Sequence, residues 1–324
     1  MYNGAPPHTP PTDDDKVVGR QDNWPSAMKH FASRIFSGNV TPQVQRERFE
    51  RINFSLWRAL KVSSQTIDVE GVCSELLVAE DSSDERIVLY LHGGAYTFGS
   101  ASSYKDLTSA IAHFGKIKVL VPNYHLAPEC PYPAALNDSV RAYRWLLTQG
   151  YKPEKIVIAG DSAGAGLALA TLLKLRDEKV ALPAACVCLS PWVDLCCEGE
   201  SYTSHEEIDP IFTSQWLRDM AKLYVQNEET RNPYISPLYA DDFKGLPSVM
   251  IQVGSDEVFL DDAITLNKRL REDGLEVNFK VYQDMWHVWQ SFAAIIPEGK
   301  EAIVEIGEFV NAKITEASLS SMAV

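Results

Sequence analysis

The segment IVIAGDSAGAGLALA, residues 156–170, carries the strongest structural signal in the chain. A largely β-branched apolar run ends at Gly160, a serine follows two positions later, and a run of small apolar residues with helical character continues beyond it. This order predicts a strand, a sharp turn and a helix. Residues 160–164 satisfy G-x-S-x-G, in which small neighbours let the strand and the helix approach each other around the serine. We therefore expect the hydroxyl of Ser162 to stand clear of the sheet, and the amide of Ala163 to point at whatever that hydroxyl attacks.

Taken alone, this five-residue pattern is weak, because a plain glycine-rich turn satisfies it equally well. The surrounding chain strengthens it, since apolar strands and amphipathic helices alternate from about residue 87 onward, as in a mainly parallel sheet with helices on both faces. An antiparallel hairpin is expected before them, at 64–70 and 72–79 around Glu70-Gly71. The other expected strands are 87–91, 117–121, 156–159, 185–189, 249–253 and 277–282, with helices near 103–114, 134–149, 163–176, 260–273 and 298–315.

Three segments lie outside this alternation. Residues 1–22 are rich in Pro and Asp, which predicts a flexible arm. Residues 23–60 fit two amphipathic helices, the second with Phe49, Ile52, Leu56 and Leu60 at helical spacing. These helices could either cover the hydrophobic core or face the substrate. Residues 196–236 are polar and irregular around a helix near 214–225. Because ligands bind at the carboxyl ends of strands in open α/β sheets, this insertion is a candidate lid.

Composition narrows the classes of partner. The 324 residues are 45% hydrophobic and carry a net charge of −14, with a pI near 5.0, which is typical of a globular protein without an excess of Lys and Arg. Nucleic acid and an anionic membrane surface are therefore disfavoured as partners, and a neutral substrate is expected.

The six cysteines have neither zinc-like spacing with histidines nor the density of a disulfide scaffold, so we expect free thiols and a reducing compartment. The amino-terminal residues include no apolar run of signal-peptide type, and no stretch of about 18 apolar residues occurs. We predict a cytoplasmic protein, while a secreted form whose signal is absent from this sequence stays open.

A serine nucleophile needs a base, and the base needs an orienting carboxylate. The strand at 249–253 is followed by Gly254-Ser255-Asp256, and the last strand is followed by a loop that ends in His287. Taken singly, Asp256 is better explained as a helix cap and His287 as a surface histidine. However, a serine, an acid and a histidine that each follow a predicted strand are hard to explain by chance. They favour a triad of Ser162, Asp256 and His287, in the chain order of an α/β-hydrolase.

The charge that develops on the attacked carbonyl oxygen also needs N–H donors, each worth about 2.7–4 kcal/mol of barrier. The sequence His92-Gly93-Gly94-Ala95-Tyr96 follows the strand at 87–91, and its two glycines allow successive amides to converge. An ordinary glycine turn is the alternative interpretation.

Together these motifs identify a family. LHGGAY, PNYHLAPECPYPAALND (122–138), AGDSAG, SPWVD (190–194), GSDEVFLDD (254–262) and His287 resemble the hormone-sensitive-lipase-like branch of the α/β-hydrolase carboxylesterases, collinearly over about residues 65–315. The resemblance implies an eight-stranded sheet in a catalytic domain of residues 61–195 and 237–324. It also implies a helical cap built from 23–60 and 196–236. Gly94, Ala95 and Ala163 would donate to the oxyanion, with Gly93 shaping the loop.

Two departures from the family pattern stand out. Ala95 replaces the third glycine usual in HGGG, and His125 stands where the family usually has arginine, which puts one supporting interaction in doubt. His92 is expected to orient the oxyanion loop and not to act as the base.

The expected function is two-step hydrolysis of short- to medium-chain acyl esters by a serine carboxylesterase, with no metal or organic cofactor. The small-molecule ester would contact apolar side chains near the site, although each is equally well explained as core packing; they are Tyr96, Trp192, Phe212, Trp216, Phe259, Trp286 and Val288. The loop also resembles the GGG(A)X type, which favours tolerance of bulky alcohols.

Several alternatives stay open. A lactonase, an aryl-acyl-amidase or an acyltransferase would use the same residues. A non-catalytic small-molecule receptor of this fold would lack a triad member, and the presence of His287 argues against it. A protease is weaker still, because the lid would restrict access. The last strand and the final helix could form the contact of a homodimer. The sequence is equally compatible with a monomer in which this edge of the sheet is covered by the chain itself.

Overall fold

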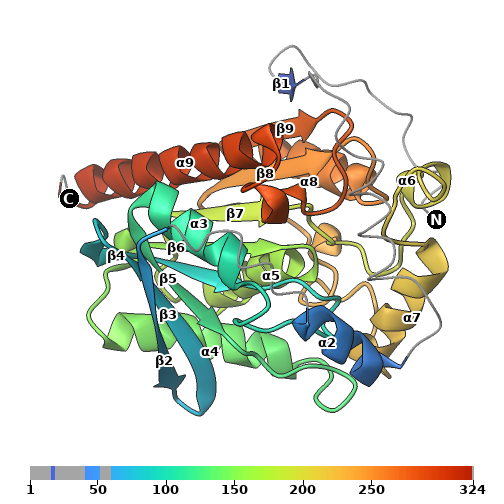
Figure 1. Cartoon of the computed structure of the whole chain (residues 1–324), viewed down its shortest axis with the longest axis horizontal. Helices are drawn as coiled ribbons and strands as arrows, with labels where there is room; N and C mark the ends of the chain where they lie inside the picture. Colours follow the sequence, from blue (N-terminus) through green and yellow to red (C-terminus); the bar gives the residue numbers. More distant parts are fainter. Residues whose placement is uncertain (1–15, 19–40, 52–59, 323–324) are drawn as a thin grey trace.

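The computed structural model describes residues 16–18, 41–51 and 60–322. Its centre is one sheet with the strand order β1-β9-β8-β7-β6-β4-β5-β3-β2 (Figure 1). The eight predicted strands are all present, and β1, from within the expected arm, adds a ninth that pairs in parallel with β9. The strands are β1 (Lys16–Val18), β2 (Val62–Val69), β3 (Val72–Ala79), β4 (Ser83–Leu91), β5 (Ile117–Pro122), β6 (Ile156–Asp161), β7 (Ala185–Leu189), β8 (Ser248–Gly254) and β9 (Val277–Tyr282).

All neighbouring strands run parallel except in the β2–β3 and β3–β5 pairs. The β2–β3 hairpin closes with Val69 opposite Val72, so Glu70 and Gly71 form the two-residue turn that the sequence predicted. Both have positive φ, at 51° and 91°, the backbone conformation that the right-handed twist of a tight hairpin requires.

Five long helices cover the two faces of the sheet, as predicted. Helices α3 and α9 pack together on one face, and α4, α5 and α8 cover the other. In Figure 1, α9 runs along the upper side of the molecule and α4 along the lower. Their bounds are α3 (Lys105–Gly115), α4 (Ala134–Thr148), α5 (Ala163–Asp177), α8 (Leu260–Glu272) and α9 (Pro297–Met322). Short 3-10 turns also occur at η1 (Pro153–Lys155), η2 (Pro237–Tyr239) and η3 (Trp289–Phe292).

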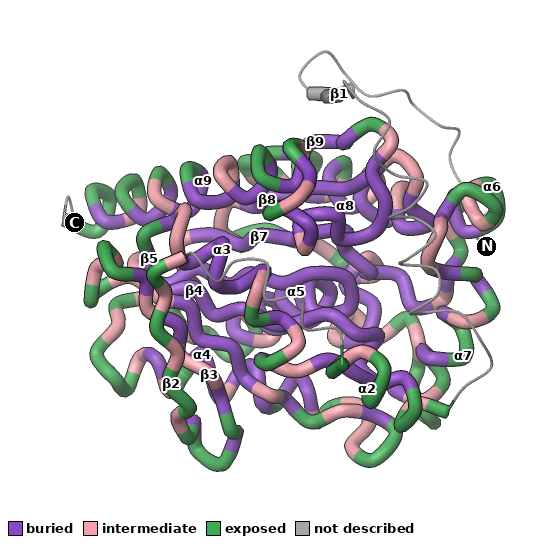
Figure 2. Tube along the Cα trace, in the orientation of Figure 1, coloured by how far each residue is buried: buried purple, intermediate pink, exposed green. Residues whose placement is uncertain are grey.

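Strand β4 illustrates how the sequence divides the core. Ile87, Leu89 and Leu91 pack toward α4 and α5, while Val88 and Tyr90 pack toward α3 and α9. Successive side chains of a strand point to opposite faces, so a continuous apolar run is what a strand covered on both sides needs. Figure 2 shows the central strands largely buried, whereas buried and exposed residues alternate within the turns of α9.

The remaining helices gather at one end of the molecule (Figure 1). They are α2 (Pro42–Glu50), α6 (Ser201–Ser204) and α7 (Ser214–Val225). Thr41 and Thr213 cap α2 and α7 by accepting hydrogen bonds from the amides of Val44 and Trp216. The first helix expected in 23–60 lies outside the described residues, as do Ile52 and Leu56 of the second.

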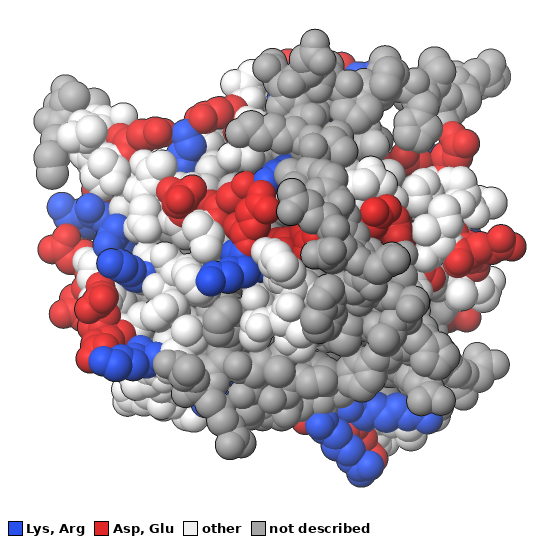
Figure 3. All heavy atoms as spheres, turned by 45° about the horizontal axis from the view of Figure 1, so that its top comes forward, with Lys and Arg blue, Asp and Glu red and all other residues white. Residues whose placement is uncertain are grey.

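Charges of both signs are interspersed on the face drawn in Figure 3, with Asp and Glu gathered across its middle. The side chains described on that face form no continuous basic patch, in keeping with the net charge of −14. Within the described ranges, no helix has the length and apolarity needed to cross a membrane.

Candidate active site

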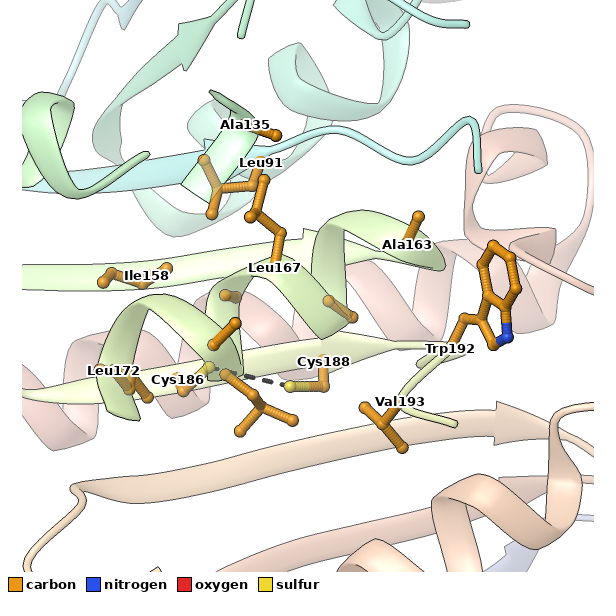
Figure 4. Packing of buried hydrophobic residues seen from close by; sticks show 14 of the residues in the cluster. Leu91, Ala135, Ile158, Ala163, Leu167, Leu172, Cys186, Cys188, Trp192 and Val193 are labelled. Atoms are coloured by element: carbon orange, nitrogen blue, oxygen red, sulfur yellow. Dashed lines mark hydrogen bonds between the residues drawn. The ribbon is translucent and has the colours of Figure 1, made fainter. Parts of the chain in front are cut away.

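Ser162 lies at the junction of β6 and α5 in a conformation that few non-glycine residues adopt, with φ 54° and ψ −125°. Its amide donates to the carbonyl of Leu189 at the end of β7 (2.8 Å), and its carbonyl accepts from the amide of Trp192 (3.1 Å). Figure 4 places Ala163 in the first turn of α5, near Trp192 beyond the end of β7. The predicted strand, sharp turn and helix are therefore present, and the strained residue is the serine.

Two glycines explain why the turn can form. A Cβ on Gly164 would lie 2.1 Å from the carbonyl oxygen of Leu91 and 2.4 Å from that of His92. A Cβ on Gly160 would lie 2.4 Å from the carbonyl oxygen of Gly164. Any larger residue at either position would push α5 away from the ends of β4 and β6, so the glycines set the position of Ser162.

The carboxylate that contacts His287 belongs to Glu257, which corrects the prediction of Asp256 as the orienting acid. Nδ1 of His287 lies 2.8 Å from Oε2 of Glu257, and Glu257 is fully buried. A carboxylate accepts, so this contact places the imidazole proton on Nδ1 and leaves Nε2 as the basic nitrogen.

The turn after β8 explains the change of residue. The amide of Asp256 donates to the carbonyl of Met285, and its carboxylate accepts from the hydroxyl of Ser255. Asp256 therefore lies half-buried within the turn, and the chain directs the next side chain, Glu257, into the interior.

Ser190 joins the ends of three strands around Glu257. Its hydroxyl donates to Oε1 of Glu257 (2.7 Å) and accepts from the amide of Val288 (3.1 Å). Oε1 of Glu257 also accepts from the amide of Gly254 (2.6 Å). Since Ser190 follows Leu189, which accepts from the amide of Ser162, the ends of β6, β7, β8 and β9 are tied together at one edge of the sheet. The sequence motif SPWVD contains Ser190, but nothing in its pattern reveals this role.

The loop after β4 has the backbone bend expected of an oxyanion loop. Gly94, Ala95 and Tyr96 all have positive φ, at 112°, 49° and 60°. The carbonyl of Gly94 accepts from the amides of Thr97 and Phe98, and a Cβ on Gly94 would lie 2.0 Å from the carbonyl oxygen of Phe98. Glycine is therefore required at position 94, whereas the bend accommodates a methyl group at Ala95.

Asp161 fixes the start of this loop. Its buried carboxylate accepts from the amide of Gly93 (2.9 Å) and from the hydroxyls of Tyr90 (2.8 Å) and Tyr104 (3.0 Å). Burial raises the pKa of Asp161 to about 6, and these hydrogen bonds oppose that shift. The amide of Gly93 is thus used to hold the loop, which fits its expected shaping role.

His92 is held within the same loop and is neutral. Nδ1 lies 2.7 Å from the carbonyl oxygen of Gly93, to which it donates, and its ring stacks on Tyr124 at 4.2 Å and on Tyr104 at 5.5 Å. Burial lowers the pKa of His92 to about 4. A neutral, fully buried imidazole can orient the loop but is poorly suited to act as the base.

Aromatic rings from the insertion and from the loop after β8 lie against His287. The rings of Phe212 and Phe259 each lie 4.9 Å from the imidazole, and Trp216 stacks on Phe212 at 5.0 Å. Phe98 of the oxyanion loop lies 6.3 Å from Trp216. Three of the predicted lining residues (Phe212, Trp216 and Phe259) are therefore gathered near His287.

The other predicted lining residues are distributed differently. Tyr96 stacks on Tyr224 of α7 at 3.8 Å and approaches Trp192 at 6.3 Å, beneath the insertion. Trp286 packs on Phe292 in a separate buried cluster, and Val288 packs on the α3 and α9 face of the sheet. The structure thus separates Trp286 and the side chain of Val288 from the aromatic group at His287.

Helix α2 is tied to the oxyanion loop by Arg46. Its guanidinium donates to the carbonyls of Thr97 and Ala127, both at 2.6 Å, and to the carboxylate of Glu129. Phe49 of the same helix packs on Phe98 at 5.1 Å. Sequence reasoning did not find Arg46, because no local pattern marks an arginine whose partners lie 51 to 83 residues away.

His125 supports its loop although it replaces the usual arginine. Its backbone amide and Nδ1 both contact the carboxylate of Asp138, which also accepts from Arg141 at 3.1 Å. His125 and Arg141 together hold the carboxylate of Asp138.

All six cysteines are free thiols, as predicted, and the described residues contain no cluster suited to hold a metal ion.

The parallel sheet, the serine turn after β6 and the buried acid–histidine pair at the same sheet edge define an α/β-hydrolase. Comparison with known proteins agrees. A family model described as the alpha/beta hydrolase fold matches residues 88–291. An acetyl-hydrolase of Streptomyces hygroscopicus is 44% identical over 240 residues, covering 74% of this chain and 80% of the relative. An esterase of Acinetobacter venetianus is 34% identical, covering 84% and 89%.

Solved structures give the same result. A crystal structure of an esterase from the bacterial hormone-sensitive lipase family matches with a TM-score of 0.83 and 40% identity, over 89% of this chain and 99% of the other. An esterase/lipase from an uncultured bacterium matches with a TM-score of 0.85 and 37% identity, over 89% and 98%. The chain belongs to the hormone-sensitive-lipase-like branch of the α/β-hydrolase family and is a carboxylic ester hydrolase.

Proposed function

We propose that this carboxylesterase cleaves short- to medium-chain acyl esters through an acyl-enzyme formed on Ser162. The observation that carries the proposal is the network at Ser190, which ties the histidine–carboxylate pair to the strand end beside the strained serine. His287 acts as general base through Nε2, and Glu257 holds the imidazole in the required tautomer.

In the first step, Nε2 of His287 takes the proton of Ser162 as its oxygen attacks the ester carbonyl. The amides of Gly94, Ala95 and Ala163 donate to the oxyanion, and Gly93 positions their loop through its bond to Asp161. The protonated imidazole then gives its proton to the departing alcohol. In the second step, Nε2 of His287 takes a proton from water as the water oxygen attacks the acyl carbon, and it gives that proton to the oxygen of Ser162 as the acid is released.

The substrate is a neutral small-molecule ester, covered by a cap made from residues 23–60 and 196–236. The described parts of both segments support this division, since Arg46 of α2 and the aromatic residues of the insertion reach the oxyanion loop and His287. The name acetyl-hydrolase, given to the Streptomyces relative, supports the short end of the acyl range.

The test is hydrolysis of p-nitrophenyl esters from acetate to palmitate by the natural protein and by Ser162→Ala. We expect kcat/KM to rise by up to about fourfold per CH₂, from about 0.8 kcal/mol each, until the acyl pocket ends, and then to fall. Ser162→Ala should lose at least about 10⁴-fold in kcat. Ser320→Ala, at an exposed position of α9, is the matched control and should keep full activity. Activity that survives Ser162→Ala, or peaks at palmitate, would contradict the proposal.

A further inference from the structure

A buried carboxylate outside the triad lies in the insertion. Asp209 is only 7% exposed, between α6 and α7. Its Oδ1 accepts from the amides of Ile211 (2.8 Å) and Phe212 (3.1 Å), and its Oδ2 accepts from the amide of Val258 (3.0 Å). One carboxylate therefore joins the insertion to the loop after β8, which carries Glu257.

The insertion holds both polar backbone groups of Val258. Asp209 accepts from its amide, and the hydroxyl of Ser201 donates to its carbonyl at 2.6 Å. Val258 follows Glu257 directly, and Glu257 contacts His287. Fixing the residue next to the acid restricts the directions in which that acid can point, so the insertion helps to set the histidine–carboxylate geometry.

Asp209 also places an aromatic ring against the base. Its bonds to the amides of Ile211 and Phe212 hold the chain in a tight turn, which presents the ring of Phe212 to His287 at 4.9 Å and 68°. The opposite ring, Phe259, lies one residue beyond Val258 and at the same distance from the imidazole. Both rings that confine His287 are therefore anchored close to Asp209.

The charge of Asp209 acts on His287 as well. Burial raises the pKa of Asp209 to about 6, and the amide of Val258 and electrostatic attraction to a protonated His287 oppose that shift. The other ionisable groups near this pair are Glu257 and Asp161 on the side of His287, Asp261 in the first turn of α8, and His205, Glu206 and Glu207 on the segment of Asp209 itself. Above about pH 6, Asp209 adds a negative charge that favours the imidazolium.

We propose that Asp209 is a positioning residue for His287, whose carboxylate fixes the Glu257 loop and the Phe212 ring and whose charge stabilises the protonated imidazole. This inference rests on the proposed function, in which His287 becomes protonated during each step. It gives the insertion a role in catalysis besides covering the substrate.

The experiment compares Asp209→Asn with Glu229→Gln, which removes the same charge from an exposed position of the same insertion. Rates with p-nitrophenyl acetate are measured from pH 5 to pH 9. For Asp209→Asn we expect kcat to fall about tenfold or more with KM nearly unchanged, and the acid limb of kcat/KM to move to lower pH by about half a unit, because the imidazolium loses a stabilising negative charge. Glu229→Gln should change neither quantity.

Two results would overturn the inference. One is an unchanged kcat for Asp209→Asn. The other is a reduced kcat with the acid limb of kcat/KM unmoved, because a purely structural role would not shift that limb. Asp209→Glu keeps the charge and gives a second test, in which the limb should stay at its wild-type position even if kcat falls. A limb shifted in Asp209→Glu as well would refute the charge effect. Failure of the proposed function looks different, because the wild type would then be inactive or insensitive to Ser162→Ala.

Discussion

Replacing Glu257 by glutamine should reverse the proton arrangement of His287. Oε1 of Glu257 accepts from two donors, the hydroxyl of Ser190 and the amide of Gly254. A glutamine must turn its carbonyl oxygen toward these donors, which leaves its NH₂ group facing Nδ1 of His287. Nδ1 can then only accept, so the proton moves to Nε2, and the nitrogen that should take the proton of Ser162 is blocked.

The size of the effect follows from this reversed tautomer. The equivalent acid-to-amide change in a serine protease triad costs about 10⁴ in kcat, or about 5.5 kcal/mol of barrier. Because Glu257 is fully buried, water cannot enter to relieve the wrong contact, and we expect a loss of about 10³–10⁴-fold in kcat with little change in KM.

The assay is steady-state hydrolysis of p-nitrophenyl acetate at pH 8, with circular dichroism to verify folding. The matched control is Asp256→Asn, one residue earlier, which removes a half-buried carboxylate that bonds to Ser255 and should cost less than about threefold. If Asp256→Asn were as damaging as Glu257→Gln, or if Glu257→Gln kept more than a tenth of kcat, the assignment of the orienting acid would be wrong.

Two other changes test the support around the serine. Arg46→Ala removes the contacts of α2 with the carbonyls of Thr97 and Ala127, and we expect kcat/KM to fall about tenfold as the oxyanion loop loosens; an unaltered kcat/KM would refute this link. Gly164→Ala puts a methyl group 2.1 Å from the carbonyl oxygen of Leu91, so the free energy of unfolding measured in urea should fall by about 1–3 kcal/mol. Esterase activity should fall as well, and a fully active, equally stable variant would contradict the packing argument.

Most of the fold was predictable, because each central strand is a short apolar run followed by a turn. Strands β7 and β9 begin and end at the predicted residues, and the Glu70-Gly71 turn lies where the alternation breaks. The prediction of α9 ended seven residues early, at 315 rather than Met322. The short strand β1 could not be predicted, since three residues carry no usable periodicity and their pairing with β9 is set by the sheet edge.

The candidate site was predictable down to the motif but not always to the residue. Asp256 and Glu257 are adjacent carboxylates, and only the turn that bonds the amide of Asp256 to Met285 decides which side chain turns inward. Trp286 lies next to His287 in sequence yet packs on Phe292, because neighbouring residues in a loop can point in opposite directions. Long-range partners such as those of Arg46 and Asp209 depend on tertiary packing, which no local pattern encodes.

The hydroxyl of Ser190 has a consequence for the order in which activity arises during folding. It joins Glu257, beyond the end of β8, to the amide of Val288, beyond β9, so Glu257 and His287 meet only after β8 and β9 have paired. If the proposed triad is correct, a nascent or truncated chain that already contains the serine turn should have no esterase activity. Recovery of hydrolysis during refolding reports the final pairing of β8 and β9, and it should lag behind the return of helical circular dichroism.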